Sequence, residues 1–390
     1  MKNTRLILVA LLATLLLPFQ EATAQSETDT LSGKAFASLI TCGPGNEYYL
    51  AFGHTSIRIC DPVQSIDRVY NYGTFDFNTP NLYWKFVKGE LIYCVSSCHY
   101  DNFVYSYLNE GRSLSEQRLR LTHSELERLA ANLKENDTPE NRNYLYDFFR
   151  DNCATRARDI IDSSLIGRKL FAETVADTNR TFREMIYQYS GRKLMWWQLG
   201  VDLLIGMRCD RPLSSKQYMF IPFDLATQMD TTHVAGSRQT LVERREQILS
   251  ETKTPNPDSV PPALVFWLLF AVVLLLSAIG FRKGWKLRWI DIPLFAVVSL
   301  LSVIIIVMWF FTIHWCTKEN LNILWANPLF FYFTARLQKS NKILIYIELA
   351  LLLLSLFGFG LLPQQFNVAL LPVILTLITR LVCCLLQKKP

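Results

Sequence analysis

Four long apolar segments in the last third of the chain restrict most strongly what it can fold into. Each is long enough for a helix of about 20 residues, the length that crosses the hydrocarbon core of a bilayer. Such a helix satisfies its own backbone hydrogen bonds, so it is stable in lipid. The sequence therefore predicts a membrane domain at residues 263–390, built on Ala263–Phe281, Ile292–Ile313, Ile343–Leu362 and Asn367–Leu386. We expect Arg380, in the last segment, to lie close enough to the helix end to reach the membrane surface.

The segment Leu321–Phe333 is ambiguous because it mixes asparagine and proline with apolar residues. Cytoplasmic loops carry an excess of Lys and Arg, and this bias distinguishes the two possible topologies. If the segment crosses the membrane, all three basic clusters of the membrane domain fall on one side. We therefore predict about five membrane helices, with the N-terminal part outside and the C-terminus in the cytoplasm. The clusters are Arg282/Lys283/Lys286/Arg288, Arg336/Lys339/Lys342 and Lys388/Lys389.

The N-terminus has the pattern of a secretory signal peptide, which we place at residues 1–24. Lys2 and Arg5 precede an apolar core at Leu6–Leu17, and Ala22–Ala24 has the small residues of a cleavage site. An uncleaved anchor is the alternative. Either form exports the segment that follows, so we predict a periplasmic domain at residues 25–250. A stretch rich in Pro, Thr and Ser then predicts a linker at residues 251–262.

A helix is predicted to begin at Cys153. Ala157 and Ile160–Ile161 recur at helical spacing after it, and Asp151–Asn152 stand where N-cap residues belong. The cysteine then lies in the first turn, where unpaired backbone N–H groups and the helix dipole favour a negative charge. A thiolate stabilised in this way is a good nucleophile at neutral pH. A small buried cysteine behind a capped helix is the other interpretation of the same residues.

Three polar residues earlier in the chain are candidate partners of this thiol. His54 opens an alternating stretch with the pattern of a strand, and it could act as a general base if it faces Cys153. A further side chain should orient the histidine, and Asn71 and Asp76 in the next strand region are the candidates. The nine cysteines lack the paired spacing of a zinc site, so we predict no metal ion and no cofactor.

The rest of the N-terminal part has the pattern of a mixed α and β domain. A helix should begin within Leu121–Glu127, where Ser124 and Glu127 are spaced as a capping box. The aromatic stretch Met195–Gly206 fits either a protein core or a lipid contact. The predicted strands are Phe36–Thr41, Thr55–Ile59, Arg68–Tyr72 and Leu91–Val95.

The order of these elements, a histidine on a strand and then a cysteine at a helix start, resembles the circularly permuted NlpC/P60 (papain-like) thiol enzymes. The segments His54–Arg58, Asp151–Asp159 and Leu199–Asp202, together with the membrane domain, resemble the Lnb family. Members of that family are membrane-anchored lipoprotein N-acyltransferases of bacteria that lack the usual nitrilase-type enzyme. The resemblance implies an α+β permuted papain-like (NlpC/P60-type) periplasmic domain followed by an all-α transmembrane domain, in the bacterial inner (cytoplasmic) membrane.

The resemblance also implies an activity. Cys153 would take an acyl chain from a membrane phospholipid as a thioester, and His54 would accept and return the proton. The acceptor would be the N-terminal amine of a diacylglyceryl-cysteine lipoprotein. Basic residues beside apolar runs indicate membrane topology, and we expect no nucleic-acid partner. Two alternatives stay open: a membrane-tethered thiol peptidase or amidase acting on cell-wall peptides, and a non-catalytic envelope protein.

Four polar residues lie near the predicted outer ends of the second and third spans, namely His314, Asn320, Asn322 and Asn327. Polar groups at this depth are costly unless they are paired or functional. One interpretation is structural, with hydrogen bonds to headgroups and backbone. The other is that some of them line the groove through which lipid reaches Cys153.

Overall fold

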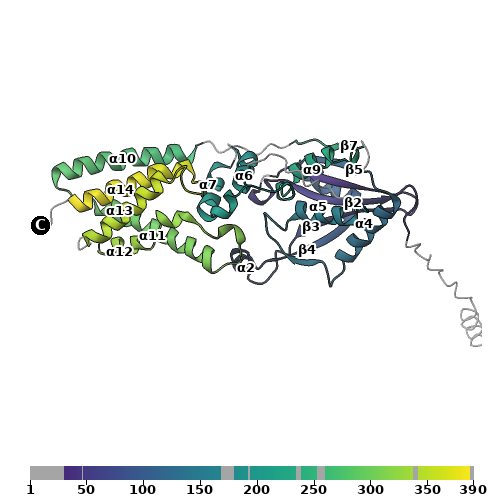
Figure 1. Cartoon of the computed structure of the whole chain (residues 1–390), viewed down its shortest axis with the longest axis horizontal. Helices are drawn as coiled ribbons and strands as arrows, with labels where there is room; N and C mark the ends of the chain where they lie inside the picture. The colour runs from purple at the N-terminus through teal and green to yellow at the C-terminus, as the bar shows by residue number, and fades with distance from the viewer. Residues whose placement is uncertain are drawn as a thin grey trace, which may run out of the picture.

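The computed structural model of the protein describes residues 30–45, 47–167, 180–191, 194–233, 239–252, 260–336 and 341–386. The predicted signal peptide at 1–24 and most of the predicted linker at 251–262 lie outside these ranges. A mixed α and β domain occupies one end of an elongated molecule, and a bundle of helices occupies the other (Figure 1).

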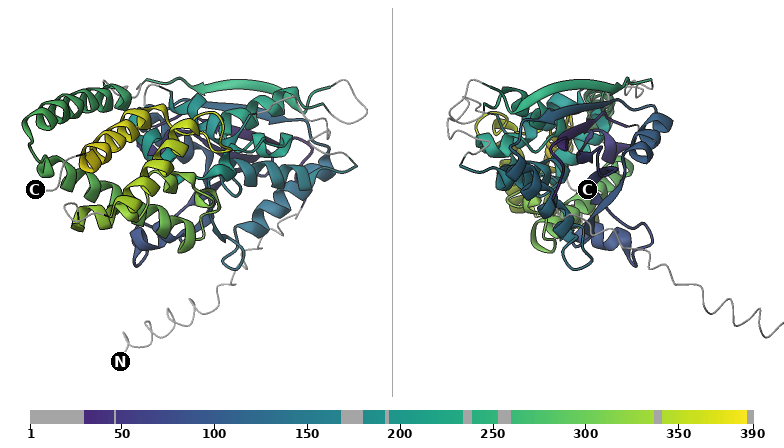
Figure 2. Two further views of the ribbon diagram at one scale, coloured as in Figure 1. Left: turned by 60° about the vertical axis from the view of Figure 1, so that its left-hand side comes forward. Right: turned by 90° about the vertical axis from the view of Figure 1, so that its right-hand side faces the viewer.

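The N-terminal domain is built on a seven-stranded sheet with the order β6-β4-β3-β2-β1-β5-β7. Its strands are β1 (Phe36–Cys42), β2 (His54–Asp61), β3 (Ile66–Thr74), β4 (Ile92–His99), β5 (Leu114–Leu119), β6 (Asn143–Leu145) and β7 (Val242–Leu249). Neighbouring strands pair antiparallel. The four predicted strands are confirmed as β1–β4. Figure 2 shows β7 running along one side of the domain, where it completes the sheet beside β5.

Helices cover both faces of this sheet. Successive side chains of a strand point to opposite faces, so Leu39 and Ile40 of β1 enter different apolar clusters. Leu39 packs with α4 and α5, whereas Ile40 packs with α3. Because α5 lies against β2 and β3, its first turn is held beside those two strands. The helices are α2 (Leu82–Lys88), α3 (Tyr100–Glu110), α4 (His123–Asn136), α5 (Cys153–Ser164), α6 (Phe182–Ser190), α7 (Met195–Leu204), α8 (Ser215–Tyr218) and α9 (Pro222–Thr231).

The capping box predicted at Ser124 and Glu127 is wrong by two residues. Thr122 is the N-cap of α4, and its side chain accepts a hydrogen bond from the N–H of Glu125. The Glu125 carboxylate accepts the N–H of Thr122 in return, at 2.9 Å. Glu125 is also buried and accepts the N–H of Ile166. This tertiary contact favours a capping box at Thr122 and Glu125 over the one predicted at Ser124 and Glu127.

The membrane domain contains three helices that are long and apolar enough to cross a bilayer among the residues described: Pro262–Lys283, Arg288–Phe310 and Val368–Leu386. They correspond to α10 (Pro262–Lys283), α11 (Arg288–Phe310) and a short 3-10 turn followed by α14 (Leu371–Leu386). Between α11 and α14 lie α12 (Leu329–Arg336) and α13 (Lys342–Phe357). Both are shorter than the roughly 20 residues of a full span. The chain preceding α12 runs through two 3-10 turns, Trp315–Thr317 and Leu321–Leu324.

Arg380 does not reach the membrane surface as expected. Its guanidinium is buried and pairs with Asp291 of α11, with Nε 2.6 Å from Oδ1 and Nη2 3.0 Å from Oδ2. Nη1 donates to the Ser277 hydroxyl of α10 at 2.8 Å. The ion pair therefore joins α10, α11 and α14. The expectation failed because Asp291 and Ser277 lie on other segments of the sequence, and only the packing of the helices brings them to Arg380.

The predicted topology can be tested between α12 and α13. In Figure 1, α10, α12 and α14 all end on the side of the bundle away from the sheet. That is the course expected if the segment from Leu321 to Arg336 crosses the bilayer. We expect a reporter fused after Lys342 to give a cytoplasmic signal, matching a fusion after Lys283 and opposing one after Pro261. A periplasmic signal after Lys342 would reduce the number of spans to four.

Candidate active site

Cys153 is the first residue of α5, and its position is fixed by the residue before it. The Asn152 side chain accepts the N–H of Thr155 at 2.9 Å, and the Thr155 hydroxyl accepts the N–H of Asn152 at 2.8 Å. The amide nitrogen of Asn152 also donates to the carbonyls of Phe148 and Phe220. The reciprocal capping box satisfies two backbone donors, and the bond to Phe220 ties the helix start to a distant part of the chain. Cys153 is only 7% exposed.

The thiol of Cys153 lies beside the imidazole of His54, the first residue of β2, and interacts with it electrostatically. The backbone N–H groups of Thr55 and Ala154 also point at the sulfur. Burial alone would raise the pKa of Cys153, but His54 and these N–H groups outweigh it, and the pKa is lowered. Burial would likewise lower the pKa of His54, but Cys153 and Asn71 reverse this effect, so the pKa is raised. Both shifts favour a thiolate beside an imidazolium.

Asn71 holds the other side of the histidine ring. Nε2 of His54 donates to Oδ1 of Asn71, which lies on β3 next to β2. Nδ1 is therefore the ring nitrogen that this bond leaves available to the thiol of Cys153. The Ser56 hydroxyl also approaches Oδ1 of Asn71, at 3.4 Å. The structure thus brings together three of the four predicted residues: Cys153, His54 and Asn71.

Asp76 is not part of this arrangement. It lies on an exposed turn after β3, where its carboxylate accepts the N–H of Asn78 at 2.8 Å. Asn71 and Asp76 are only five positions apart in sequence, but β3 ends between them, at Thr74. Asn71 is still in register with β2, whereas Asp76 has left the sheet.

Gly73 and Tyr146 line the site, although nothing in the sequence marked either as functional. Gly73 has a φ of +98°, where a side chain would be strained, and lies at an irregularity in the pairing of β3 with β4. A Cβ atom there would stand 3.9 Å from the His54 ring and 4.0 Å from Cβ of Cys153. Glycine therefore leaves space directly over the pair. The ring of Tyr146 borders the same space and stacks on Tyr93, with centroids 4.4 Å apart.

An aromatic cluster connects the segments before His54 and Cys153 to the membrane domain. Phe52, two residues before His54, packs against Phe148 and against Trp197 of α7. On the other side of the cluster, Phe182 contacts Trp315. Trp315 lies in the segment between α11 and α12, which we call the outer loop of the membrane domain. The stretch Met195–Gly206, for which core and lipid contact were both open, thus contributes to packing between the two domains.

Three of the four polar residues considered for a lipid groove are used inside the protein. Asn320 donates to the carbonyls of Leu203 and Leu204, and Asn322 donates to that of Asp202. Asn327 donates to the carboxylate of Glu348, and all three asparagines are buried. These contacts attach the outer loop of the membrane domain to α7 and α13. They support the structural interpretation of these three asparagines rather than a role in a lipid groove.

The Asp202 carboxylate adds a buried polar junction between the domains. Its two oxygens accept hydrogen bonds from Arg183 at 2.7 Å, from the Tyr187 hydroxyl at 2.8 Å and from Asn367 at 2.7 Å. Arg183 is fully buried and also pairs with Asp210. Because Arg183 lies in α6 and Asn367 precedes α14, this carboxylate holds the site-bearing domain against the membrane helices.

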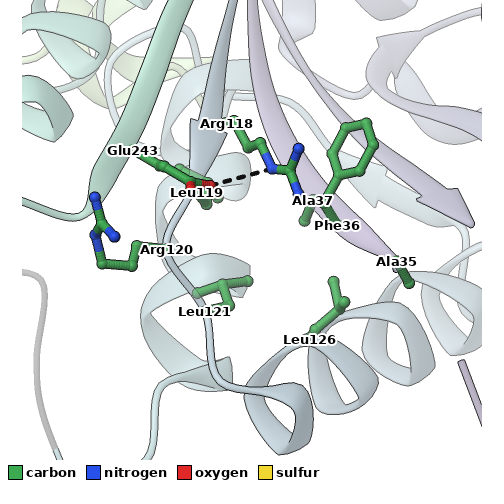
Figure 3. A pocket seen from close by; sticks show the side chains of 9 residues that line it. All are labelled: Ala35, Phe36, Ala37, Arg118, Leu119, Arg120, Leu121, Leu126 and Glu243. Carbon is green, nitrogen blue, oxygen red and sulfur yellow. Dashed lines mark ion pairs between the residues drawn. The ribbon is translucent and has the colours of Figure 1, made fainter. Parts of the chain in front are cut away.

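A pocket elsewhere in the N-terminal domain contains none of Cys153, His54 and Asn71. It has a volume of about 200 Å³ and lies where β1 and β5 meet α4 (Figure 3). Its lining includes Phe36, Leu126 and Arg118, which is paired with Glu243 at 3.2 Å. The lining has no cysteine, serine or histidine, and its one carboxylate, Glu243, is paired with Arg118, so we do not assign the chemistry to this pocket.

Comparison with known families accounts for both parts of the chain. Residues 21–185 match the Lnb N-terminal periplasmic domain, and residues 254–390 match the Lnb transmembrane domain. The chain belongs to the Lnb family. No curated protein and no solved structure matches it. As an Lnb protein it is a membrane protein with a periplasmic domain, and its family is associated with lipoprotein processing. Cys153, His54 and Asn71 all lie within the periplasmic match.

Proposed function

We propose that this Lnb protein is a lipoprotein N-acyltransferase of the bacterial inner membrane. It would move an acyl chain from a phospholipid to the N-terminal amine of a diacylglyceryl-cysteine lipoprotein. The observation that carries the proposal is the Cys153–His54–Asn71 arrangement at a helix start. We also infer that its α/β domain is a permuted papain-like fold, since thiol enzymes of that class combine a cysteine at a helix start with a histidine on a strand.

In the first half-reaction the Cys153 thiolate attacks the carbonyl carbon of the phospholipid ester. A carbon–sulfur bond forms, and negative charge develops on the carbonyl oxygen, which backbone N–H groups near the start of α5 can stabilise. When the carbon–oxygen bond breaks, the imidazolium of His54 gives its proton to the departing lysophospholipid alcohol. The products are an acyl thioester on Cys153 and a neutral His54.

The second half-reaction returns the enzyme to its starting state. The lipoprotein amine attacks the thioester carbonyl while His54 accepts the amine proton. An amide bond forms, the carbon–sulfur bond breaks and the thiolate is regenerated beside the imidazolium. Atoms and charges balance without a metal ion or cofactor.

Two features support transfer to an amine rather than to water. Cys153 is nearly buried, and Tyr146 with its stacked partner Tyr93 lies at the edge of the space beside it. A thioester in an enclosed apolar site is protected from hydrolysis until an acceptor docks. The membrane domain also supplies phospholipid at high local concentration, which a simple tether on a cell-wall hydrolase would not require.

The direct test is the intermediate. The full-length protein purified in native phospholipid should carry one acyl chain on Cys153, seen by intact mass and by peptide mapping, and hydroxylamine should remove it. A diacylated lipopeptide with a free N-terminus should discharge the thioester and yield the N-acylated peptide, while its N-acetylated form should not. Cys98→Ala, at a partly exposed cysteine of β4, should acylate normally.

Failure of this test would favour one of the alternatives. If Cys153 is never acylated but the protein cleaves cell-wall peptides in a Cys153-dependent way, the peptidase or amidase hypothesis replaces the proposal. If neither activity is found and Cys153→Ala has no phenotype, the non-catalytic hypothesis stands.

A further inference from the structure

Helix α2 exposes apolar side chains that a water-soluble surface would not favour. None of its seven residues is buried. Tyr83 is 84% exposed, Trp84 60% and Phe86 58%, and Phe77 in the preceding turn is 67% exposed. Contiguous exposed apolar residues of this kind mark an interaction surface. Trp and Tyr are enriched where proteins meet the headgroup region of a membrane.

The end of α2 is joined to the outer end of the membrane-spanning helix α11. The N–H of Ile313 donates to the carbonyl of Lys88 at 2.9 Å, and Nε2 of His314 lies 3.1 Å from the carbonyl of Phe86. The contact at Gly89 is so close that a Cβ atom there would stand 2.9 Å from Ile313. Figure 1 shows α2 at the level where the bundle meets the N-terminal domain.

The same apolar surface continues onto the membrane helix. Phe310 and Phe311, at the end of α11, are 65% and 71% exposed, and Ile313 is 53% exposed. Since α11 crosses the bilayer, its exposed outer end must face lipid or headgroups, and α2 is bonded directly to it. This continuity identifies the occupant of the α2 surface as the lipid leaflet rather than a soluble protein.

The charges on α2 fit such a position. Lys85 and Lys88 are its two basic residues, and Lys88 lies 5.8 Å from the centre of the Trp84 ring. Lysine can lay its aliphatic stem along apolar surface while its amine contacts headgroups. The helix itself carries no acidic residue, whereas Asp76 lies at the start of the turn before it and Glu90, which follows it, is paired with Lys88 at 3.5 Å.

A row of aromatic rings leads from this surface to the thiol. Phe77 packs on Phe75 with centroids 4.6 Å apart, and Phe75 packs on Tyr93 at 5.1 Å. Tyr93 stacks on Tyr146, whose ring borders the space over Cys153. The row begins at an exposed residue and ends at the nucleophile, and its side chains offer apolar contact along the way.

We propose that α2 and the turn before it, residues 76–89, insert into the outer leaflet, and that the aromatic row guides a phospholipid acyl chain from there to Cys153. The insertion stands on the exposure of α2 and its attachment to α11. The guidance rests on the proposed acyltransferase function. Two experiments address the two parts separately.

The first experiment tests insertion without using activity. A photo-crosslinking amino acid is placed at Trp84 in the full-length protein, reconstituted in vesicles of phosphatidylethanolamine and phosphatidylglycerol. The matched control carries it at Val63, which is 61% exposed in the β2–β3 turn at the opposite end of those strands from α2. Phospholipid adducts are expected at Trp84 and not at Val63, and Cys153→Ala should not change them. Adducts only to protein at Trp84, or equal lipid adducts at both positions, would overturn the insertion.

The second experiment tests guidance. Trp84→Glu and Phe77→Glu should slow thioester formation from vesicle phospholipid by about tenfold or more, because a charge opposes entry into the interface. The same variants should lose much less activity toward a water-soluble short-chain thioester than toward vesicle phospholipid, and Val63→Glu should leave both rates unchanged. Unchanged acylation from vesicles would overturn the guidance. If the unmodified protein is never acylated, the proposed function fails, while the crosslinking result still decides the insertion.

Discussion

Cys153→Ala and His54→Ala are each expected to lower the rate of lipopeptide N-acylation by at least about a thousandfold, since a nucleophile and its base act as one unit. Cys153 cannot be replaced as the acyl carrier, and without His54 the thiol loses the partner that lowers its pKa. The double variant should be no slower than the slower single variant. Rates are measured in native phospholipid at equal amounts of folded, membrane-inserted protein.

His99→Ala and His123→Ala are the matched controls, because both histidines are exposed and lie outside the site. Their rates should stay close to that of the unmodified protein. Near-normal turnover by His54→Ala at normal abundance would show that His54 is not the base.

Asn71→Ala should have a smaller effect with a distinct pH dependence. The hydrogen bond from His54 to Asn71 helps to raise the pKa of His54, so its loss should lower that pKa. The imidazolium that protonates the leaving alcohol is present below this pKa and is lost as the pH rises through it. The alkaline limit of acylation should therefore move to lower pH in the variant. An unchanged pH profile would contradict a role for Asn71 in positioning His54.

The second large effect is expected on stability. Arg380→Leu leaves the Asp291 carboxylate buried without its partner, and breaking a buried ion pair in this way costs about 3–5 kcal/mol. Asp291 is 2% exposed, so water cannot replace the lost hydrogen bonds. The variant should show a clearly lower midpoint of thermal unfolding in detergent and lower abundance in membranes.

The control is the double variant Arg380→Leu/Asp291→Leu. Replacing both members of a buried pair by apolar residues is often neutral, so most of the lost stability should return. Ser277→Ala removes only one hydrogen bond to the guanidinium and should cost about 1 kcal/mol. Unchanged unfolding of Arg380→Leu would show that the pair contributes little to the fold.

Local signals in the sequence determined several features of this protein. The apolar segments indicated the membrane domain because the length and composition of a spanning helix are local properties. The residues around Asn152 predicted a helix that begins at Cys153, because a cap is formed within four positions. Strands β1–β4 were also predictable, since alternation is a local pattern. The same residues allowed the resemblance to the Lnb family to be recognised.

Other features depend on contacts between residues that are distant in sequence, and only the tertiary structure decided them. Register between β2 and β3 places Asn71, and not Asp76, beside His54. Packing of three helices turns Arg380 inward to Asp291. The exposed aromatic face of α2 can be interpreted as a membrane contact only because α2 is attached to the end of α11, more than two hundred residues later. Composition reports which side chains a segment carries, but the fold determines what each of them meets.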